Sequence, residues 1–151
     1  MTLLAPYDGS ALSRAAINRA TEFADYRGEE VVVLTVVPDD RAFALERGWI
    51  EEGETYDPKS VERQFAGEVE QVAPAATFRT EQPESMASLA ATTHNDITRT
   101  IRQVAHDIDA SIVFVGSDNA GRVSTPVTSV GSPISEDPEY DVHIVRHTDD
   151  G

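Results

Sequence analysis

Residues 31–37 read Val-Val-Val-Leu-Thr-Val-Val, and this stretch decides the fold. Six of its seven side chains are apolar, and nearly all are β-branched. Continuous apolarity, without the alternation of a strand that has one wet face, predicts a strand covered on both faces. The runs at 2–6 (Thr-Leu-Leu-Ala-Pro) and 111–115 (Ser-Ile-Val-Phe-Val) have the same character. We therefore expect buried strands of a mostly parallel sheet.

Helical periodicity fills the intervals between these runs. Apolar residues recur every three or four positions over 11–24 and 95–108, and again between Pro58 and Pro74. Ser10 is a good N-cap and Gly28 a plausible C-cap for the helix that starts at Ala11, and Asp57 is a good N-cap for the helix that starts at Pro58. A short helix is expected from Ser132 to Pro138. Two further strands are expected, a weak one near an edge at 75–80 and a last one at 142–146.

Strands that alternate with helices predict a single α/β domain over residues 1–147, followed by a short tail at 148–151. The expected architecture is an open, Rossmann-like parallel sheet with helices on both faces. Ligands of such sheets bind outside the carboxyl ends of the strands. Chemistry is therefore sought at 7–10, at 36–38 and after Val115. The polar segment 38–56 is expected to be a long loop with a turn or two of helix, and loops of that length are often functional.

The charge of the chain excludes some classes of partner. Twelve Lys and Arg residues oppose 27 Asp and Glu residues, for a formal charge of −15, and Lys59 is the only lysine. Nucleic acids and anionic membranes both need basic patches, so neither is an expected partner. The acids are spread along the chain and not gathered in a tail, which favours a surface adapted to high salt in the cytosol of a halophile.

Other features bound the compartment and the chemistry. Cysteine is absent, which excludes disulfides and thiolate metal sites. The N-terminal segment lacks the basic start of a signal peptide, and no apolar run approaches the roughly 20 residues of a membrane span, so we expect a cytoplasmic location. The Gly-x-Ser-x-Gly, Walker and Gly-x-Gly-x-x-Gly motifs are absent. The four histidines are scattered, so no catalytic residue and no metal ligand is predicted.

Four motifs, taken in order, carry a family resemblance. They are Pro6-Tyr7-Asp8-Gly9-Ser10, Asp-Ala-Ser-Ile-Val-Phe-Val-Gly-Ser at 109–117, the pair Gly131-Ser132, and a last apolar strand that ends in Arg146. From Leu3 to Arg146 the chain resembles the universal stress protein (UspA-like) family, in an acidic, haloarchaeal type. The resemblance implies an adenine nucleotide alpha hydrolase-like fold of five parallel strands in the order 3-2-1-4-5. It also implies a homodimer through 142–146 and, in some members, binding of ATP with Mg²⁺.

The resemblance also implies a set of ligand-binding residues. Pro6 and Asp8 match the opening motif, with Asp8 near the nucleoside, and Val36 matches the residue whose backbone meets the adenine. In ATP-binding members the phosphate loop reads Gly-x-x-Gly, then nine residues, then Gly-Ser or Gly-Thr. Here Gly116 stands, but Asn119 replaces the second glycine, Gly121 follows it, and Gly131-Ser132 arrives after eleven residues.

Those departures leave three functions open. The first is a stress-response module that binds an adenine nucleotide, with Arg122 as the only cation near the phosphates and with slow hydrolysis at most. The second is a homodimeric protein-interaction module of the same fold that has lost its ligand and acts through the last strand and the 38–56 loop. The third, an adenylating enzyme, lacks its usual signature after the first strand.

Overall fold

The computed structural model describes residues 1–82, 91–117 and 140–148, with the backbone alone for 91–96. Five strands and four helices follow one another in these residues: β1 (Thr2–Pro6), α1 (Ala11–Arg27), β2 (Glu30–Val36), α2 (Arg41–Glu46), α3 (Pro58–Val72), β3 (Thr77–Glu81), α4 (Ala91–Asp107), β4 (Ala110–Gly116) and β5 (Asp141–Val145). No helix among the described residues is long and apolar enough to cross a membrane.

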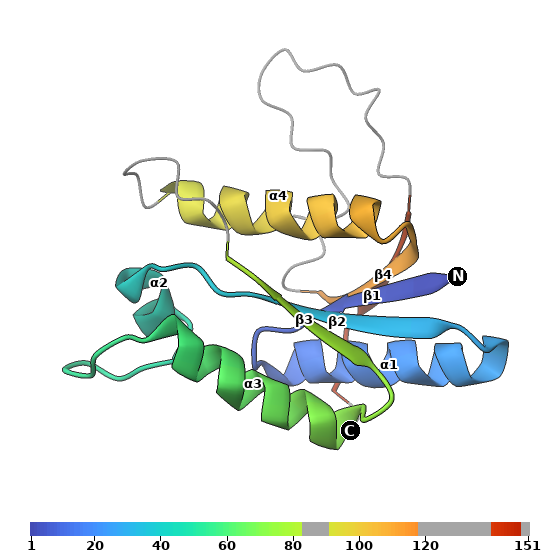
Figure 1. Ribbon diagram of the computed structural model, residues 1–151, viewed down its shortest axis with the longest axis horizontal. Helices are drawn as coiled ribbons and strands as arrows, with labels where there is room; N and C mark the ends of the chain where they lie inside the picture. The colour runs from blue at the N-terminus through green and yellow to red at the C-terminus, as the bar shows by residue number, and fades with distance from the viewer. Residues whose placement is uncertain (83–90, 118–139, 149–151) are drawn as a thin grey trace, which may run out of the picture.

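The strands form one parallel sheet in the order β3-β2-β1-β4-β5 (Figure 1). The predicted α/β class and strand order are therefore confirmed. At the centre, Leu4 of β1 lies beside Val32 of β2 on one side and Val113 of β4 on the other. Because all five strands run the same way, their carboxyl ends meet at one edge of the sheet.

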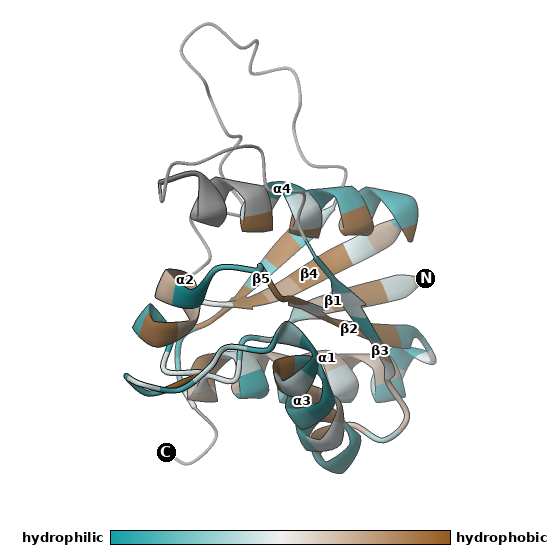
Figure 2. Cartoon of the chain, turned by 60° about the vertical axis from the view of Figure 1, so that its left-hand side comes forward, coloured by the Kyte–Doolittle hydropathy of each residue, from teal (hydrophilic) through white to brown (hydrophobic). Residues whose placement is uncertain are grey.

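Helices cover both faces of the sheet (Figures 1 and 2). α1 and α3 pack on one face, where Leu3, Ala5 and Phe114 meet Ile17 of α1 and Phe65 of α3. α4 packs on the other face, where a second set of apolar residues gathers: Leu4, Leu34, Val36, Ile101, Val104, Ala105, Val113 and Val115. β1, β2 and β4 are buried on both sides because consecutive side chains enter opposite layers.

Local signals placed most of the helix ends correctly. Ser10 caps α1 by accepting a hydrogen bond from the Ser13 amide at 3.1 Å, and Gly28 ends that helix with φ at 68°. Asp57 caps α3 ahead of Pro58, as predicted. α1 runs on to Arg27, three residues past the expected end, and α4 begins at Ala91, four residues before the expected start.

The structure tests the predictions for the 38–56 segment and for the third strand, but not those for two later segments. The 38–56 segment contains the short helix α2, and β3 lies at the sheet edge, as expected. The predicted helix at 132–138, most of the 117–130 loop and most of the 81–94 connection lie outside the described residues.

Two aromatic residues give a matched test of the core. Phe114 is fully buried, with its ring centroid 5.9 Å from that of Phe23, whereas Tyr26 is 90% exposed. Phe114→Ala should lower the free energy of unfolding by about 3–5 kcal/mol because it leaves a cavity. Tyr26→Ala should change it by less than about 0.5 kcal/mol. Denaturant unfolding measures both, and equal effects would contradict the described packing.

Candidate functional site

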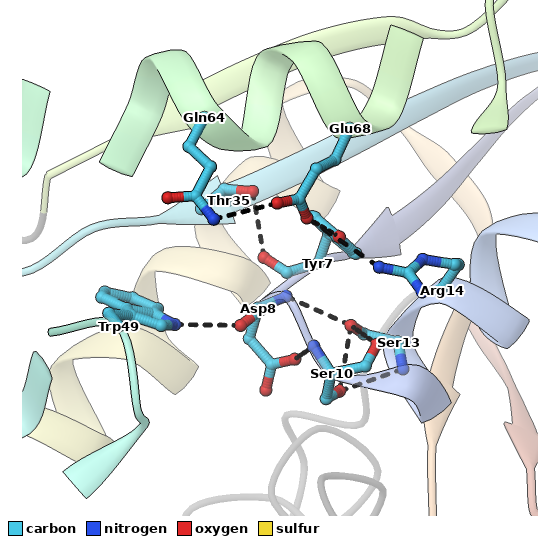
Figure 3. Close-up of polar contacts among 9 residues, drawn as sticks. All are labelled: Tyr7, Asp8, Ser10, Ser13, Arg14, Thr35, Trp49, Gln64 and Glu68. Carbon is cyan, nitrogen blue, oxygen red and sulfur yellow. Dashed lines mark hydrogen bonds and ion pairs between the residues drawn. The ribbon is translucent and has the colours of Figure 1, made fainter. Parts of the chain in front are cut away.

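The site begins at the turn between β1 and α1, which is tied to the end of β2. The Tyr7 amide donates to the Leu34 carbonyl at 2.8 Å. The fully buried Thr35 hydroxyl donates to the Tyr7 carbonyl at 3.0 Å (Figure 3). Both backbone groups of Tyr7 are thus satisfied by β2, so the following residue leaves the sheet in a fixed direction.

Gly9 and Ser10 complete this turn. Gly9 has φ at 86°, a backbone conformation that favours glycine, and a Cβ there would lie only 3.0 Å from Cζ of Phe65. The Ser10 amide then donates to Oδ1 of Asp8 at 3.0 Å, while the Asp8 amide donates to the Ser13 hydroxyl at 3.3 Å (Figure 3). The Asp8 carboxylate is therefore held by its own turn.

The segment between α2 and α3 folds over the same strand ends. Nε1 of Trp49 donates to the Asp8 carbonyl at 3.0 Å, as Figure 3 shows. The Trp49 ring packs edge-on against Phe43 and Phe65, with centroid distances of 5.4 and 5.6 Å. Tyr56 donates its hydroxyl hydrogen to the Pro38 carbonyl at 2.7 Å. The 38–56 segment thus packs on the site and does not stand away from it.

Together these elements enclose a hollow at the carboxyl edge of the sheet. It contains about 640 Å³ of empty space, counted with the part that opens to solvent. Strand ends, the α2 segment and α4 all line it: Pro6, Tyr7, Asp8, Ser13, Leu34, Val36, Phe43, Arg47, Trp49, Ile97, Thr98, Ile101, Val115 and Gly116. Most of these side chains are apolar, as is usual in pockets for small molecules.

The structure brings half of the predicted site residues together. Pro6, Asp8, Val36 and Gly116 come from three different strand ends and line this one hollow. The other predicted residues, Asn119, Gly121, Gly131 and Ser132, lie outside the described residues.

Arg47 is a site residue that the sequence did not reveal. Its Nη1 lies 3.0 Å from Oδ2 of Asp8, and its guanidinium carbon lies 5.2 Å from the centre of the Phe43 ring. The expectation of one cation near the phosphates named Arg122, which lies outside the described residues, and did not include Arg47. The two partners are 39 residues apart in sequence, and only the folding of the α2 segment brings them together.

The charge of Asp8 is stabilised by its surroundings. Burial by itself raises the pKa of this carboxyl group, but hydrogen bonds from Ser10 and Ser13 and the positive charge of Arg47 lower it. The net result is a pKa below the ordinary value of an aspartate. Asp8 is consequently an anion at neutral pH, and it can accept hydrogen bonds from a ligand.

A second, more polar hollow lies across the turn, toward α3. Arg14, Gln64 and Glu68 line it, together with Arg47 and Trp49. The Tyr7 hydroxyl donates to Glu68, and Arg14 lies 4.0 Å from the same carboxylate (Figure 3). Burial and the hydrogen bond to Glu68 raise the pKa of Tyr7 to about 12, so this phenol stays protonated. These polar groups satisfy one another.

The first hollow has the lining that is usual in a small-molecule binding site. Apolar walls flank one carboxylate and one guanidinium, which fits a flat ring that carries hydroxyl or anionic groups. Within the described part of the chain, no three His, Asp or Glu side chains gather as a metal site would require.

Asp8→Asn tests the electrostatic account of this turn. At pH 7 the substitution should lower the free energy of unfolding by about 1–3 kcal/mol, because it leaves the partly buried Arg47 without its counter-charge. The lowered pKa of Asp8 means that its contribution is present above the ordinary carboxyl pKa of about 3.9 and is lost as pH falls through the lower, folded-state value. Denaturant unfolding of both proteins should thus show a difference that shrinks from pH 7 to about pH 3. A difference that is constant with pH would contradict the ionic role.

Comparison with known sequences identifies the family of this chain. The profile described as "Universal stress protein family" matches residues 1–146. A search of curated protein sequences returns no significant match.

Solved structures share the fold. A universal stress protein family member from Burkholderia pseudomallei gives a TM-score of 0.56 at 17% identity, over 97% of this chain and 96% of that chain. The universal stress protein from Archaeoglobus fulgidus in complex with dAMP gives 0.55 at 15% identity, over 97% and 98%. A universal stress protein in complex with cAMP gives 0.53 at 19% identity, over 98% and 97%. These identities are low and support the fold alone, whereas the profile spans nearly the whole sequence. The chain therefore belongs to the universal stress protein family.

Proposed function

We propose that this chain is a cytoplasmic, homodimeric stress-response module that binds an adenine nucleotide at the carboxyl edge of its sheet. The observation that carries the proposal is the convergence of Pro6, Asp8, Val36 and Gly116 on one hollow. The family resemblance named these four residues, which come from β1, β2 and β4 and the turn after β1. The rule that ligands bind at the carboxyl ends of parallel strands points to the same edge of the sheet.

The lining fits the parts of such a ligand. Leu34, Ile97 and Val115 offer apolar walls to a purine ring, and the backbone at Val36 offers hydrogen bonds to its edge. The ionised Asp8 can accept a hydrogen bond from a ribose hydroxyl, which is the role that an acidic residue near a different strand plays in other nucleotide-binding sheets. ATP would bring Mg²⁺ on its own phosphates, since Asp8 is the only acidic residue among the described lining residues.

The phosphate-binding part of the proposal involves residues beyond the described ones. Gly116 ends β4 at the hollow, and Asn119, Gly121, Gly131 and Ser132 follow it in sequence. Glycines allow backbone amides to approach phosphate oxygens closely. Two structural relatives are complexes with dAMP and cAMP. They support an adenine nucleotide as the ligand class here.

We also infer that the formal charge of −15 is an adaptation to high salt, of the haloarchaeal type. The homodimer is proposed to form at β5, which is one of the two edge strands of the sheet formed by the described residues. Ser117 donates to the Val145 carbonyl at 2.9 Å, so the backbone groups of Val145 face β4. Because these groups alternate along a strand, those of Val142 and Ile144 face the open edge.

One observation favours the alternative of an interaction module without nucleotide. Arg47 already pairs with the carboxylate of Asp8, and Trp49 already donates a hydrogen bond to its carbonyl. If those contacts served only to close the hollow, the 38–56 segment and β5 would be the functional surfaces. Nucleotide titration separates the two functions.

Nucleotide binding is tested with two matched tryptophan substitutions, one within α4 at Ile97 and one just after its last residue at Ile108. Ile97 lines the hollow, and Ile108 lies near the opposite end of the helix and does not line it; both are partly buried against the same core. Calorimetric titration in dilute buffer and in concentrated KCl should show AMP and ATP·Mg binding to the wild-type protein. Ile97→Trp should abolish binding because the indole fills the hollow, whereas Ile108→Trp should retain it. No binding of millimolar nucleotide to the wild-type protein would reject the proposal in favour of the interaction module.

The dimer is tested at the outward-facing backbone of β5. Light scattering should give twice the 16.4 kDa chain mass for the wild-type protein. Val142→Pro removes an amide on the open edge and should give the single-chain mass with an unchanged circular dichroism spectrum. Val142→Thr keeps the amide and should stay dimeric. A single-chain mass for the wild-type protein, or a dimeric proline variant, would contradict the proposed interface.

A further inference from the structure

We propose that Arg47 recognises a phosphate of the bound ligand, so that the site selects phosphorylated adenine nucleosides over free adenosine. This inference rests on the proposed nucleotide function and goes beyond it, because Arg47 belongs to none of the motifs that suggested the site. The residue stands just after α2, at the C-cap position.

The position of Arg47 is fixed by two contacts. Nη1 donates to Oδ2 of Asp8 at 3.0 Å, and the guanidinium lies over the Phe43 ring at 5.2 Å. The side chain is 23% exposed, and that of Asp8 is 21% exposed. An arginine that is stacked and paired in this way is ordered before any ligand arrives, which reduces the entropic cost of using it.

The charges of the hollow make this arginine necessary for an anion. Among the described lining residues, Asp8 is the only acid and Arg47 is the only base. Asp8 alone would repel a phosphate close to it, in a chain whose formal charge is already −15. Pairing with Arg47 neutralises that local charge. The pair therefore turns a repulsive corner into a neutral one that carries strong donors.

Arg47 has more N–H donors than its contact with Asp8 uses. The contact with Asp8 uses Nη1, and a guanidinium carries five N–H donors in a planar fork. Donors that are not used by Asp8 can form paired hydrogen bonds with two phosphate oxygens. Asp8 then acts in two ways, as an acceptor for the ribose and as the group that orients Arg47.

A purely structural role for Arg47 predicts a different outcome. If the arginine only held the α2 segment over the hollow, its loss would weaken all ligands of the hollow alike, apart from the repulsion between an unpaired Asp8 and a phosphate, which Arg47→Lys does not introduce. If it contacts a phosphate, its loss weakens AMP and leaves adenosine nearly unchanged. The ratio of the two affinities therefore separates the roles, and AMP avoids the added variable of Mg²⁺.

The experiment compares AMP and adenosine on four proteins by calorimetric titration. Arg47→Gln should reduce the preference for AMP over adenosine by about tenfold to hundredfold, the range expected for a charge-assisted hydrogen bond. Arg14→Gln removes the same charge from an arginine that lines only the second hollow, and it should leave the ratio unchanged. Arg47→Lys keeps the charge but not the fork, and it should lower the ratio by an intermediate factor.

The outcomes separate this inference from the proposed function. If neither ligand binds the wild-type protein, the nucleotide function itself fails. If AMP binds and the ratio in Arg47→Gln stays within about twofold of wild type, the phosphate role is overturned while the nucleotide function stands. Circular dichroism checks the fold of each variant. Should Arg47→Gln fail to fold, Arg47→Lys decides, and an unchanged ratio there overturns the inference.

Discussion

The Phe65 ring joins the three chain segments that surround the site. It packs edge-on against Tyr7 at a centroid distance of 5.2 Å and against Trp49 at 5.6 Å. It also lies so close to the β1–α1 turn that a Cβ at Gly9 would meet it at 3.0 Å. The Phe65 ring of α3 thus helps to position both the β1–α1 turn and the indole of Trp49. Because Asp8 belongs to that turn and Arg47 stands two residues before Trp49, their ion pair depends on this packing.

Tyr7 and Asp8, the two residues after β1, have different roles at the edge of the sheet. The side chain of Tyr7 points toward α3, where its hydroxyl group donates a hydrogen bond to Glu68. Burial raises the pKa of Tyr7, so the phenol stays protonated. Asp8, the next residue, lines the hollow, and its carboxylate accepts hydrogen bonds from the Ser10 amide and from Arg47. The backbone between them is anchored by Leu34 and Thr35 of β2. A stabilising contact to α3 and an acid that lines the hollow therefore lie on adjacent residues without sharing partners.

The fold was predictable from sequence because its causes are local. Continuous apolarity marks β1, β2 and β4, and caps at Ser10, Asp57 and Gly28 mark helix ends. The hollow was predictable in part, since parallel strands bring Asp8, Val36 and Gly116 to one edge. The contacts of Arg47 and Trp49 were not predictable. They depend on how a polar segment with little periodicity packs against residues such as Asp8 and Phe65, and no local pattern encodes that docking. The aromatic residues within an otherwise acidic 38–56 segment were the one available signal.

The acidity of the whole chain affects how the Asp8–Arg47 pair could act on an anionic ligand. A formal charge of −15 sets up a field that opposes the approach of any nucleotide. Salt screens that field over a Debye length of about 10 Å at 0.1 M and about 3 Å at 1 M, so concentrated salt removes most of the long-range repulsion. A contact at 3.0 Å inside a partly buried hollow is screened much less. High salt therefore weakens the long-range repulsion between the acidic chain and an anion more than it weakens a close contact between Arg47 and that anion. A local pair with a well-ordered arginine is an arrangement that would let so acidic a surface coexist with the proposed site for a negatively charged ligand.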